Sequence, residues 1–289
     1  MKRLILILTL LFSPLVYSAD VSEYTASGPI ENIGGTDFSG LEWGTTVDGV
    51  SGEFRVDNKT SILTYPTSEA IKTCGIGGDL EGIAMGEQGT FYTINEAKSG
   101  IGVFDVHSVT GCTTVRRFET QGATVNLEGI AIKDGIIYLL DENTGNIYWF
   151  VDTGYVKPDK ATIQLLFNIP NCPGAGDLAF NGENIVAICD GIPLLQEYTL
   201  NGDFVAENNY QGINNAEALY FNDDQMCLGG EPDEYLCFTG DDPVEPPPAP
   251  TEEACTYSGS IVVNIDTGAF DSQTVDFICP TLTANGTLN

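Results

Sequence analysis

Carboxylates recur at two fixed places along this chain. The first place opens a short apolar stretch rich in Gly and Ala, and the second lies 13 to 15 residues further on. The acids at these places are Glu81, Glu96, Glu128, Glu142, Asp177, Asp190 and Glu217. Oxygen ligands suit a hard cation, and calcium accepts irregular shells of roughly 6 to 8 oxygens better than magnesium does. We therefore expect these acids to hold calcium.

The pattern has exceptions, which leave the number of ligands open. Ser39 stands at the first place in one copy, and Asp177 is one residue out of register. Asn58 and Glu231 stand in or beside the second place of the first and fifth copies. The alternative interpretation is that these acids are solvated strand ends with raised pKa values. Their recurrence in register favours a cation site over that alternative.

The repeat that carries these acids has the length of a propeller blade. Its five copies begin at residues 39, 81, 128, 176 and 217, so the steps are 42, 47, 48 and 41 residues. Four-stranded propeller blades have this length. Turn residues and further β-rich runs follow the opening stretches, and no sustained helical period occurs after the N-terminus. We expect an all-β fold, a five-bladed β-propeller, with six blades as the alternative if a degenerate copy exists.

Blade geometry explains why the two places would meet. The innermost strand of a blade lines the central channel, and the second strand runs antiparallel beside it. The start of the first strand and the end of the second therefore share one edge. Like charges at a narrow channel mouth repel one another, and a bound cation would relieve that repulsion.

The N-terminus predicts export. Two basic residues precede the apolar run Leu4–Phe12, and small residues up to Ser18 suit a signal peptidase, so we expect a signal peptide over residues 1–18. The mature protein would then be secreted or periplasmic. All eight cysteines follow Ser18, and an even number in an exported chain favours disulfides. Zinc is disfavoured because the chain has no CxxC pair and one histidine, His107.

The expected strands predict how six of the cysteines pair. Directly opposed positions in a hairpin lie within disulfide range. The predicted pairs are Cys227–Cys237 across a hairpin, Cys172–Cys189 at the shared strand edge and, by exclusion, Cys74–Cys112.

The fifth copy shows only three strands, so we expect the β-prone segment 21–25 to supply the outer strand of the last blade and close the ring. The propeller would occupy residues 19–240, followed by a Pro-rich acidic linker, 241–254. Residues 255–289 would form a small C-terminal β extension. Its expected features are strands over Ser260–Ile265 and Gln273–Ile278 and a Cys255–Cys279 staple. The extension could pack on the last blade or serve as an attachment module.

The charge excludes two classes of partner. Without Lys2 and Arg3 the mature chain has 9 basic and 41 acidic residues, a net charge of −32. Such a surface repels nucleic acid and anionic lipid. No later apolar run is long enough to span a bilayer. The expected partner is a small-molecule or extracellular ligand of unknown identity.

The opening stretches resemble a known family. The first copy reads Ser-Gly-Leu-Glu-Trp from Ser39, two others read Leu-Glu-Gly-Ile-Ala, and a Tyr-x-x-x-Glu follows in each of those two. These motifs resemble the SdiA-regulated, phytase-like (esterase-like) calcium-binding propellers over residues 35–240. The resemblance implies an exported calcium-binding propeller. The positions that match the family's acidic ones are Glu81, Glu96, Glu128, Glu142 and Glu217. Asp177 and the Ser39 copy depart from the pattern.

Two functions remain open. The first is a calcium-stabilised binding or scaffold module. The second is a calcium-dependent hydrolase, a phosphoesterase or a lactonase, in which Glu128 or Glu142 acts as the base. Few cations fall near the expected site to bind phosphate, which favours the binding module. A histidine dyad is disfavoured because His107 stands alone, and we expect it to be a solvated strand residue on the face of Asp105.

Overall fold

The computed structural model describes residues 20–32, 38–46, 48–67, 70–78, 80–86, 89–95, 101–108, 112–152, 160–172, 174–189, 192–213, 215–222, 225–230, 234–240, 256–257 and 277–278. The chain divides into two compact units, residues 1–241 and 242–289, which are described separately. Among the described residues, no helix is long and apolar enough to cross a membrane.

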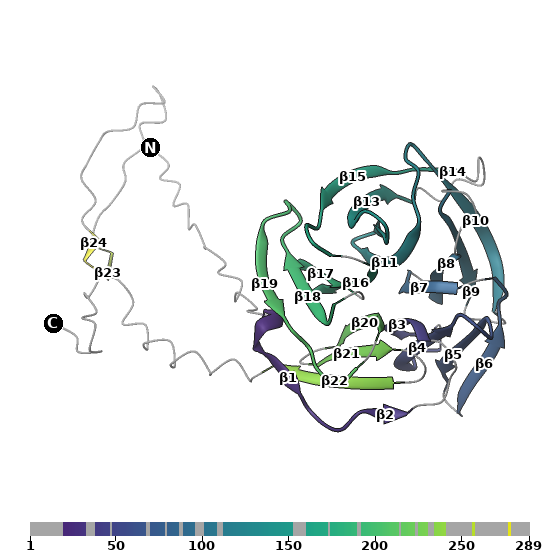
Figure 1. The fold of residues 1–289 in the computed structure, drawn as a ribbon, viewed down its shortest axis with the longest axis horizontal. Helices are drawn as coiled ribbons and strands as arrows, with labels where there is room; N and C mark the ends of the chain where they lie inside the picture. Colours follow the sequence, from purple (N-terminus) through teal and green to yellow (C-terminus); the bar gives the residue numbers. More distant parts are fainter. Residues whose placement is uncertain are drawn as a thin grey trace, which may run out of the picture. The chain divides into compact units, whose positions relative to one another are not determined.

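Five antiparallel sheets, each begun by one copy of the repeat, make up the first unit (Figure 1). Blade 1 consists of β3 (Phe38–Thr45), β4 (Ser51–Asp57), β5 (Ile62–Pro66) and β6 (Ile71–Gly75). Blade 2 consists of β7 (Leu80–Met85), β8 (Thr90–Asn95), β9 (Val103–Ser108) and β10 (Thr113–Gln121). Blade 3 consists of β11 (Leu127–Lys133), β12 (Ile136–Asp141), β13 (Asn146–Val151) and β15 (Gln164–Asn168).

The last two blades complete the ring. Blade 4 consists of β16 (Ala175–Asn181), β17 (Asn184–Cys189), β18 (Leu194–Tyr198) and β19 (Phe204–Asn208). Blade 5 consists of β20 (Ala216–Asn222), β21 (Gln225–Gly230), β22 (Glu234–Gly240) and the N-terminal strands β1 (Tyr24–Ala26) and β2 (Glu31–Asn32). The innermost strands β3, β7, β11, β16 and β20 surround a common axis (Figure 1). The prediction of an all-β, five-bladed propeller is confirmed.

Glycines let the innermost strands approach closely. A Cβ atom on Gly40 would lie 2.8 Å from the Glu81 carbonyl oxygen of the next blade, and one on Gly82 would lie 2.8 Å from the Glu128 carbonyl oxygen. Real Cβ atoms do not approach backbone this closely. In blades 1 and 2 a residue without a Cβ atom is therefore required where the innermost strands meet.

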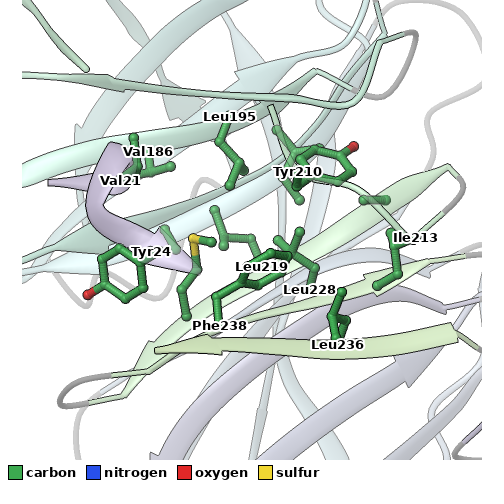
Figure 2. Close-up of a cluster of buried hydrophobic side chains, with 14 of the residues drawn as sticks. Val21, Tyr24, Val186, Leu195, Tyr210, Ile213, Leu219, Leu228, Leu236 and Phe238 are labelled. Carbon is green, nitrogen blue, oxygen red and sulfur yellow. The ribbon is translucent and has the colours of Figure 1, made fainter. Parts of the chain in front are cut away.

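The N-terminus closes the ring, as predicted. β1 pairs antiparallel with β22, joining Tyr24 to Gly240 and Ala26 to Phe238. Residues Val21–Glu23 form a single 3-10 turn, η1, instead of continuing the strand. Figure 2 shows Val21 and Tyr24 buried among side chains of blades 4 and 5, including Leu195 and Leu219. The segment thereby fastens the fifth blade to the fourth.

A second strap joins blades 2 and 3. β14 (Lys160–Thr162), which lies between the third and fourth strands of blade 3, pairs in parallel with β10 of blade 2. The Lys160 ammonium also forms an ion pair with Glu119 across this pairing. The outer edge of blade 2 is thus covered by a strand from its neighbour, which protects that edge from pairing with another chain.

The three predicted disulfides of the propeller are confirmed. Cys74–Cys112 joins blades 1 and 2, Cys172–Cys189 lies in blade 4 and Cys227–Cys237 joins β21 to β22, with Cα separations of 6.3, 4.9 and 4.1 Å. Such bonds stabilise mainly by restricting the unfolded chain. Cys255 and Cys279 lie outside the described residues.

In the second unit, β23 (Thr256–Tyr257) pairs antiparallel with β24 (Phe277–Ile278). β24 falls within the strand expected over Gln273–Ile278. The strand expected over Ser260–Ile265 lies outside the described residues, as does the predicted signal peptide.

Candidate metal centre

A β-bulge lies near the start of every innermost strand. The register shifts between Phe38/Gly40, Leu80/Ile83, Leu127/Ile130, Ala175/Leu178 and Ala216/Ala218. A bulge places two residues opposite one and re-aims the side chain at that point. The bulged positions include Glu81, Glu128 and Glu217, so the same backbone irregularity presents one acid from each of three blades.

Three of the predicted acids interact with Glu128. Its carboxyl group is hydrogen-bonded to Glu81 and interacts electrostatically with Glu142 and Glu217. Burial is the largest influence and the three neighbouring carboxylates add to it, so that the pKa of Glu128 rises to about 10. Glu81 is buried, whereas Glu128, Glu142 and Glu217 are partly exposed. The mouth therefore holds several acids that cannot all be ionised cheaply.

Two identical turns support the second row of the site. Asp57 and Asp141, which end β4 and β12, each accept hydrogen bonds from the backbone N–H and the hydroxyl of the threonine three residues on. The next residue, Asn58 or Glu142, is then presented to the mouth. Asn58 Nδ2 donates to Glu81 Oε1 at 2.9 Å. The end of the second strand and the start of an innermost strand thus meet, as the blade geometry predicted.

Amide side chains contact the acids at the mouth. Asn126 Nδ2 donates to Glu142 Oε2 at 2.5 Å, and the backbone N–H of Asn126 donates to Asp141 Oδ2 at 3.1 Å. Asn126 is a residue of the mouth that the repeat pattern did not predict. Its position immediately before the strand that opens with Leu-Glu-Gly-Ile-Ala is the only signal that could have indicated it.

Asp177 is placed differently from the glutamates. It is 1% exposed, and both carboxylate oxygens accept backbone N–H groups, from Leu178 at 2.8 Å and from Leu219 at 2.9 Å. Glu42, which the sequence analysis did not consider as a site residue, interacts electrostatically with Asp177. The sequence could have indicated Glu42, because it is an acid at a repeat position that is alanine in three other blades.

The remaining predicted ligands, Glu96 and Asp190, lie outside the described residues, as does Glu231. Within the part of the chain that the structure describes, no three His, Cys, Asp or Glu side chains converge closely enough to hold a metal ion by themselves. A cation at the mouth would therefore need oxygen atoms from amides, hydroxyls, backbone or water in addition, which calcium accepts.

The likeness to solved structures concerns the fold. The glutaminyl cyclase of Myxococcus xanthus, a propeller protein, superimposes with a TM-score of 0.50 over 72% of this chain and 95% of that chain, at 12% identity. A nidogen/laminin complex (TM-score 0.49, 16% identity, 68% and 72% covered) and the virginiamycin B lyase of Staphylococcus aureus (0.45, 15%, 68% and 65%) also match. The chain spans less than two thirds of that lyase. No protein-family model and no curated protein matches the chain.

This is a β-propeller protein. The finer resemblance to SdiA-regulated, phytase-like propellers stays a prediction.

Several cations of the propeller are engaged away from the acids at the mouth. Arg55, expected near the site, pairs with Glu53 and lies over the Tyr235 ring at 5.5 Å. Arg116 pairs with Asp152 and Arg117 pairs with Asp105. These arginines hold strands and blades together, and their charges are already compensated.

The expectation that His107 is solvated is wrong. Its side chain is 0% exposed, stacks on Phe91 with ring centroids 4.8 Å apart, and lies 2.9 Å from the Thr93 hydroxyl and 3.2 Å from the Thr114 hydroxyl. Burial lowers the pKa of His107 to about 4. His107 and Asp105 lie on the same face of β9, as expected, but both side chains are buried, and Phe91 of the paired strand β8 stacks on the imidazole.

Proposed function

We propose that this protein is a calcium-binding β-propeller whose channel mouth acts as a binding or scaffold site. The observation that carries the proposal is the gathering of Glu81, Glu142 and Glu217 around Glu128. The donor atoms are oxygens, and calcium is the common cation that accepts such a set with an irregular shell.

A cation would remove the main electrostatic cost of this arrangement. Without one, burial and the neighbouring carboxylates favour the protonated form of Glu128 at neutral pH. A bound dication would favour the ionised forms of all four glutamates. The proposed ligands are Glu81, Glu128, Glu142 and Glu217, together with Glu96 and Asp190, which lie outside the described residues. The oxygen of Asn58 is a further donor at the same edge.

Binding is favoured over hydrolysis because the three arginines among the described residues are already paired with carboxylates. Arg55 is committed to Glu53, and Arg116 and Arg117 are committed to aspartates of blades 3 and 2. A hydrolase of phosphate esters needs positive charge beside its metal.

The test compares Glu128→Gln with the wild type. Calcium at a hundredfold excess over its dissociation constant should stabilise the wild type by about 2.7 kcal/mol, which corresponds to a rise in Tm of roughly 5 to 10 °C for a domain of this size. Glu128→Gln should be at least as stable as the wild type in chelator, because it removes a costly carboxylate, and should lose most of the calcium response.

The matched control is Glu207→Gln, which removes one negative charge from the exposed outer strand β19 and should respond to calcium as the wild type does. A wild-type Tm that is the same in chelator and in calcium would contradict the proposal. Calcium-dependent turnover of a generic ester or phosphoester, lost in a folded Glu128→Gln protein, would instead identify a hydrolase.

A further inference from the structure

The innermost strands of a propeller have one edge without a strand partner. Backbone N–H groups on that edge point toward the axis and need acceptors, because a buried amide without one is costly. In this protein two acidic side chains lie at the axis and accept such N–H groups. They are Asp177 of blade 4 and Glu42 of blade 1.

Together these two carboxylates take one N–H group from each of the five blades. Asp177 accepts the N–H groups of Leu178, Leu219 and Ile130, which belong to blades 4, 5 and 3. Glu42 accepts the N–H groups of Trp43 and Met85, which belong to blades 1 and 2. The two acids also interact electrostatically with each other, so they occupy neighbouring levels of one channel.

Both acids break the repeat at the place where they stand. The position of Asp177 is taken by Gly40, Gly82, Gly129 and Ala218 in the other blades. The position of Glu42 is taken by Ala84, Ala131, Ala179 and Tyr220. The fold therefore accepts a small residue at each position in at least three blades. One acid at each position is enough to accept the N–H groups that face the axis.

Burial and the inward-facing amides act on the pKa values of these two acids in opposite directions. Burial raises the pKa of Asp177 well above its usual range, and the three amides oppose that rise. Burial likewise raises the pKa of Glu42 to about 8, opposed by the amides of Trp43 and Met85. At neutral pH burial thus favours the protonated form of both acids, and the inward-facing amides offset part of that preference because they stabilise the ionised form.

We propose that the inward-facing amides form an anion site on the propeller axis, which the protein fills with its own Asp177 and Glu42 carboxylates. Removing either side chain leaves a cavity lined by N–H groups that suits a small monovalent anion such as formate. Asp177 was predicted from the sequence as a calcium ligand, but both of its oxygens accept backbone N–H groups, so it is left out of the proposed calcium site. The inference uses none of the ligands proposed for that site.

The experiment measures Tm in chelator for the wild type, Asp177→Gly and Glu42→Ala, each with increasing sodium formate. The substitutions introduce residues that other blades already carry at these positions. Both variants should have a lower Tm than the wild type. Formate should reduce this difference in Tm by at least half, and the effect should saturate with formate concentration. The exposed control Asp203→Gly should keep a constant offset from the wild type at every formate concentration.

Two results would contradict the proposal. Variants that melt with the wild type would show that the amides do not need the carboxylates. If formate leaves the difference in Tm unchanged, the two acidic side chains contribute through packing alone. If Asp177→Gly is unfolded without formate, its folded fraction should rise with formate. The difference in Tm between Glu42→Ala and the wild type then provides an independent measurement. Because chelator is present throughout, none of these results depends on calcium binding at the mouth.

Discussion

At the scale of single residues, the interior of blade 2 holds a group whose charge the fold excludes. His107 is stacked on Phe91 and lies between the hydroxyls of Thr93 and Thr114, which accept or donate hydrogen bonds but carry no charge. The nearest charges are Asp105, which favours the protonated ring, and Arg117, which opposes it. Burial outweighs both, and the imidazole is held neutral.

This burial predicts a loss of stability in acid. The folded-state pKa of about 4 lies below the ordinary value of 6.5, so the unfolded chain binds the proton more readily. The stability is present above pH 6.5 and is lost as the pH falls toward 4. Between pH 7 and pH 5 the loss should be on the order of 2 kcal/mol.

Denaturant unfolding at both pH values measures this loss, with His107→Gln for comparison. Glutamine can still hydrogen-bond to the threonines but does not titrate, so the variant should lose less stability than the wild type over the same interval. Equal losses in the two proteins would assign the acid sensitivity to other groups.

At the scale of elements, the innermost strands are the most constrained part of the fold. In blades 1, 2 and 3 the innermost strand combines a bulge near its start with a glycine that meets the backbone of a neighbouring blade. In blade 1 a Cβ atom on Gly40 would lie 2.7 Å from a methyl carbon of Val56 and 2.9 Å from the backbone nitrogen of Ile83. The outer strands carry no such constraint.

Gly40→Ala should therefore destabilise the protein by about 1 to 3 kcal/mol, because β3 or β7 must shift to make room. Gly75→Ala is the matched control in the same blade, since its Cβ atom would have no neighbour within 4 Å. Thermal unfolding of both variants should show a lower Tm for Gly40→Ala and little change for Gly75→Ala. Equal Tm values would mean that the axis is less tightly packed than the structure indicates.

At the scale of the whole propeller, the ring is held by its N-terminal segment. β1 and β2 complete blade 5, and η1 docks on blade 4, where the backbone N–H of Val21 donates to the buried Glu197 carboxylate at 2.7 Å. Asn208 Nδ2 donates to the carbonyl oxygens of Val21 and Tyr24 at 2.7 and 3.0 Å. The segment therefore contacts two blades at the point where the ring would otherwise open.

A chain that begins at residue 33 should melt at least about 10 °C lower than the full chain. Burying Val21 and Tyr24 alone contributes roughly 3 to 6 kcal/mol. A chain that ends at residue 241 is the control, and its propeller should melt within about 2 °C of the full chain, because residues 242–289 form a separate unit. Near-UV circular dichroism during heating follows the packing of blade 5, and an unchanged melt of the first chain would contradict this role.

The five blades and the Cys227–Cys237 disulfide could be predicted from the sequence because each depends on local patterning, whereas Cys74–Cys112, which joins two blades, followed only by exclusion. Hydrophobic alternation and turn residues determine hairpins, the spacing of the opening stretches determines the blade count, and Cys227 faces Cys237 because they share a hairpin. The shared edge that brings Asn58 to Glu81 also follows from the hairpin geometry.

Tertiary packing decided which acids meet and what each of them contacts. Glu128 and Asp177 stand in equivalent stretches of the repeat, yet one lies among carboxylates and the other accepts amides from three blades. A shift of one residue in a strand turns a side chain to the other face, where it meets the axis instead of the mouth. The burial of His107 likewise depends on its neighbours on the adjacent strands, Phe91 of β8 and Thr114 of β10. Side-chain environments of this kind arise between segments distant in the chain, so periodicity along the sequence does not contain them.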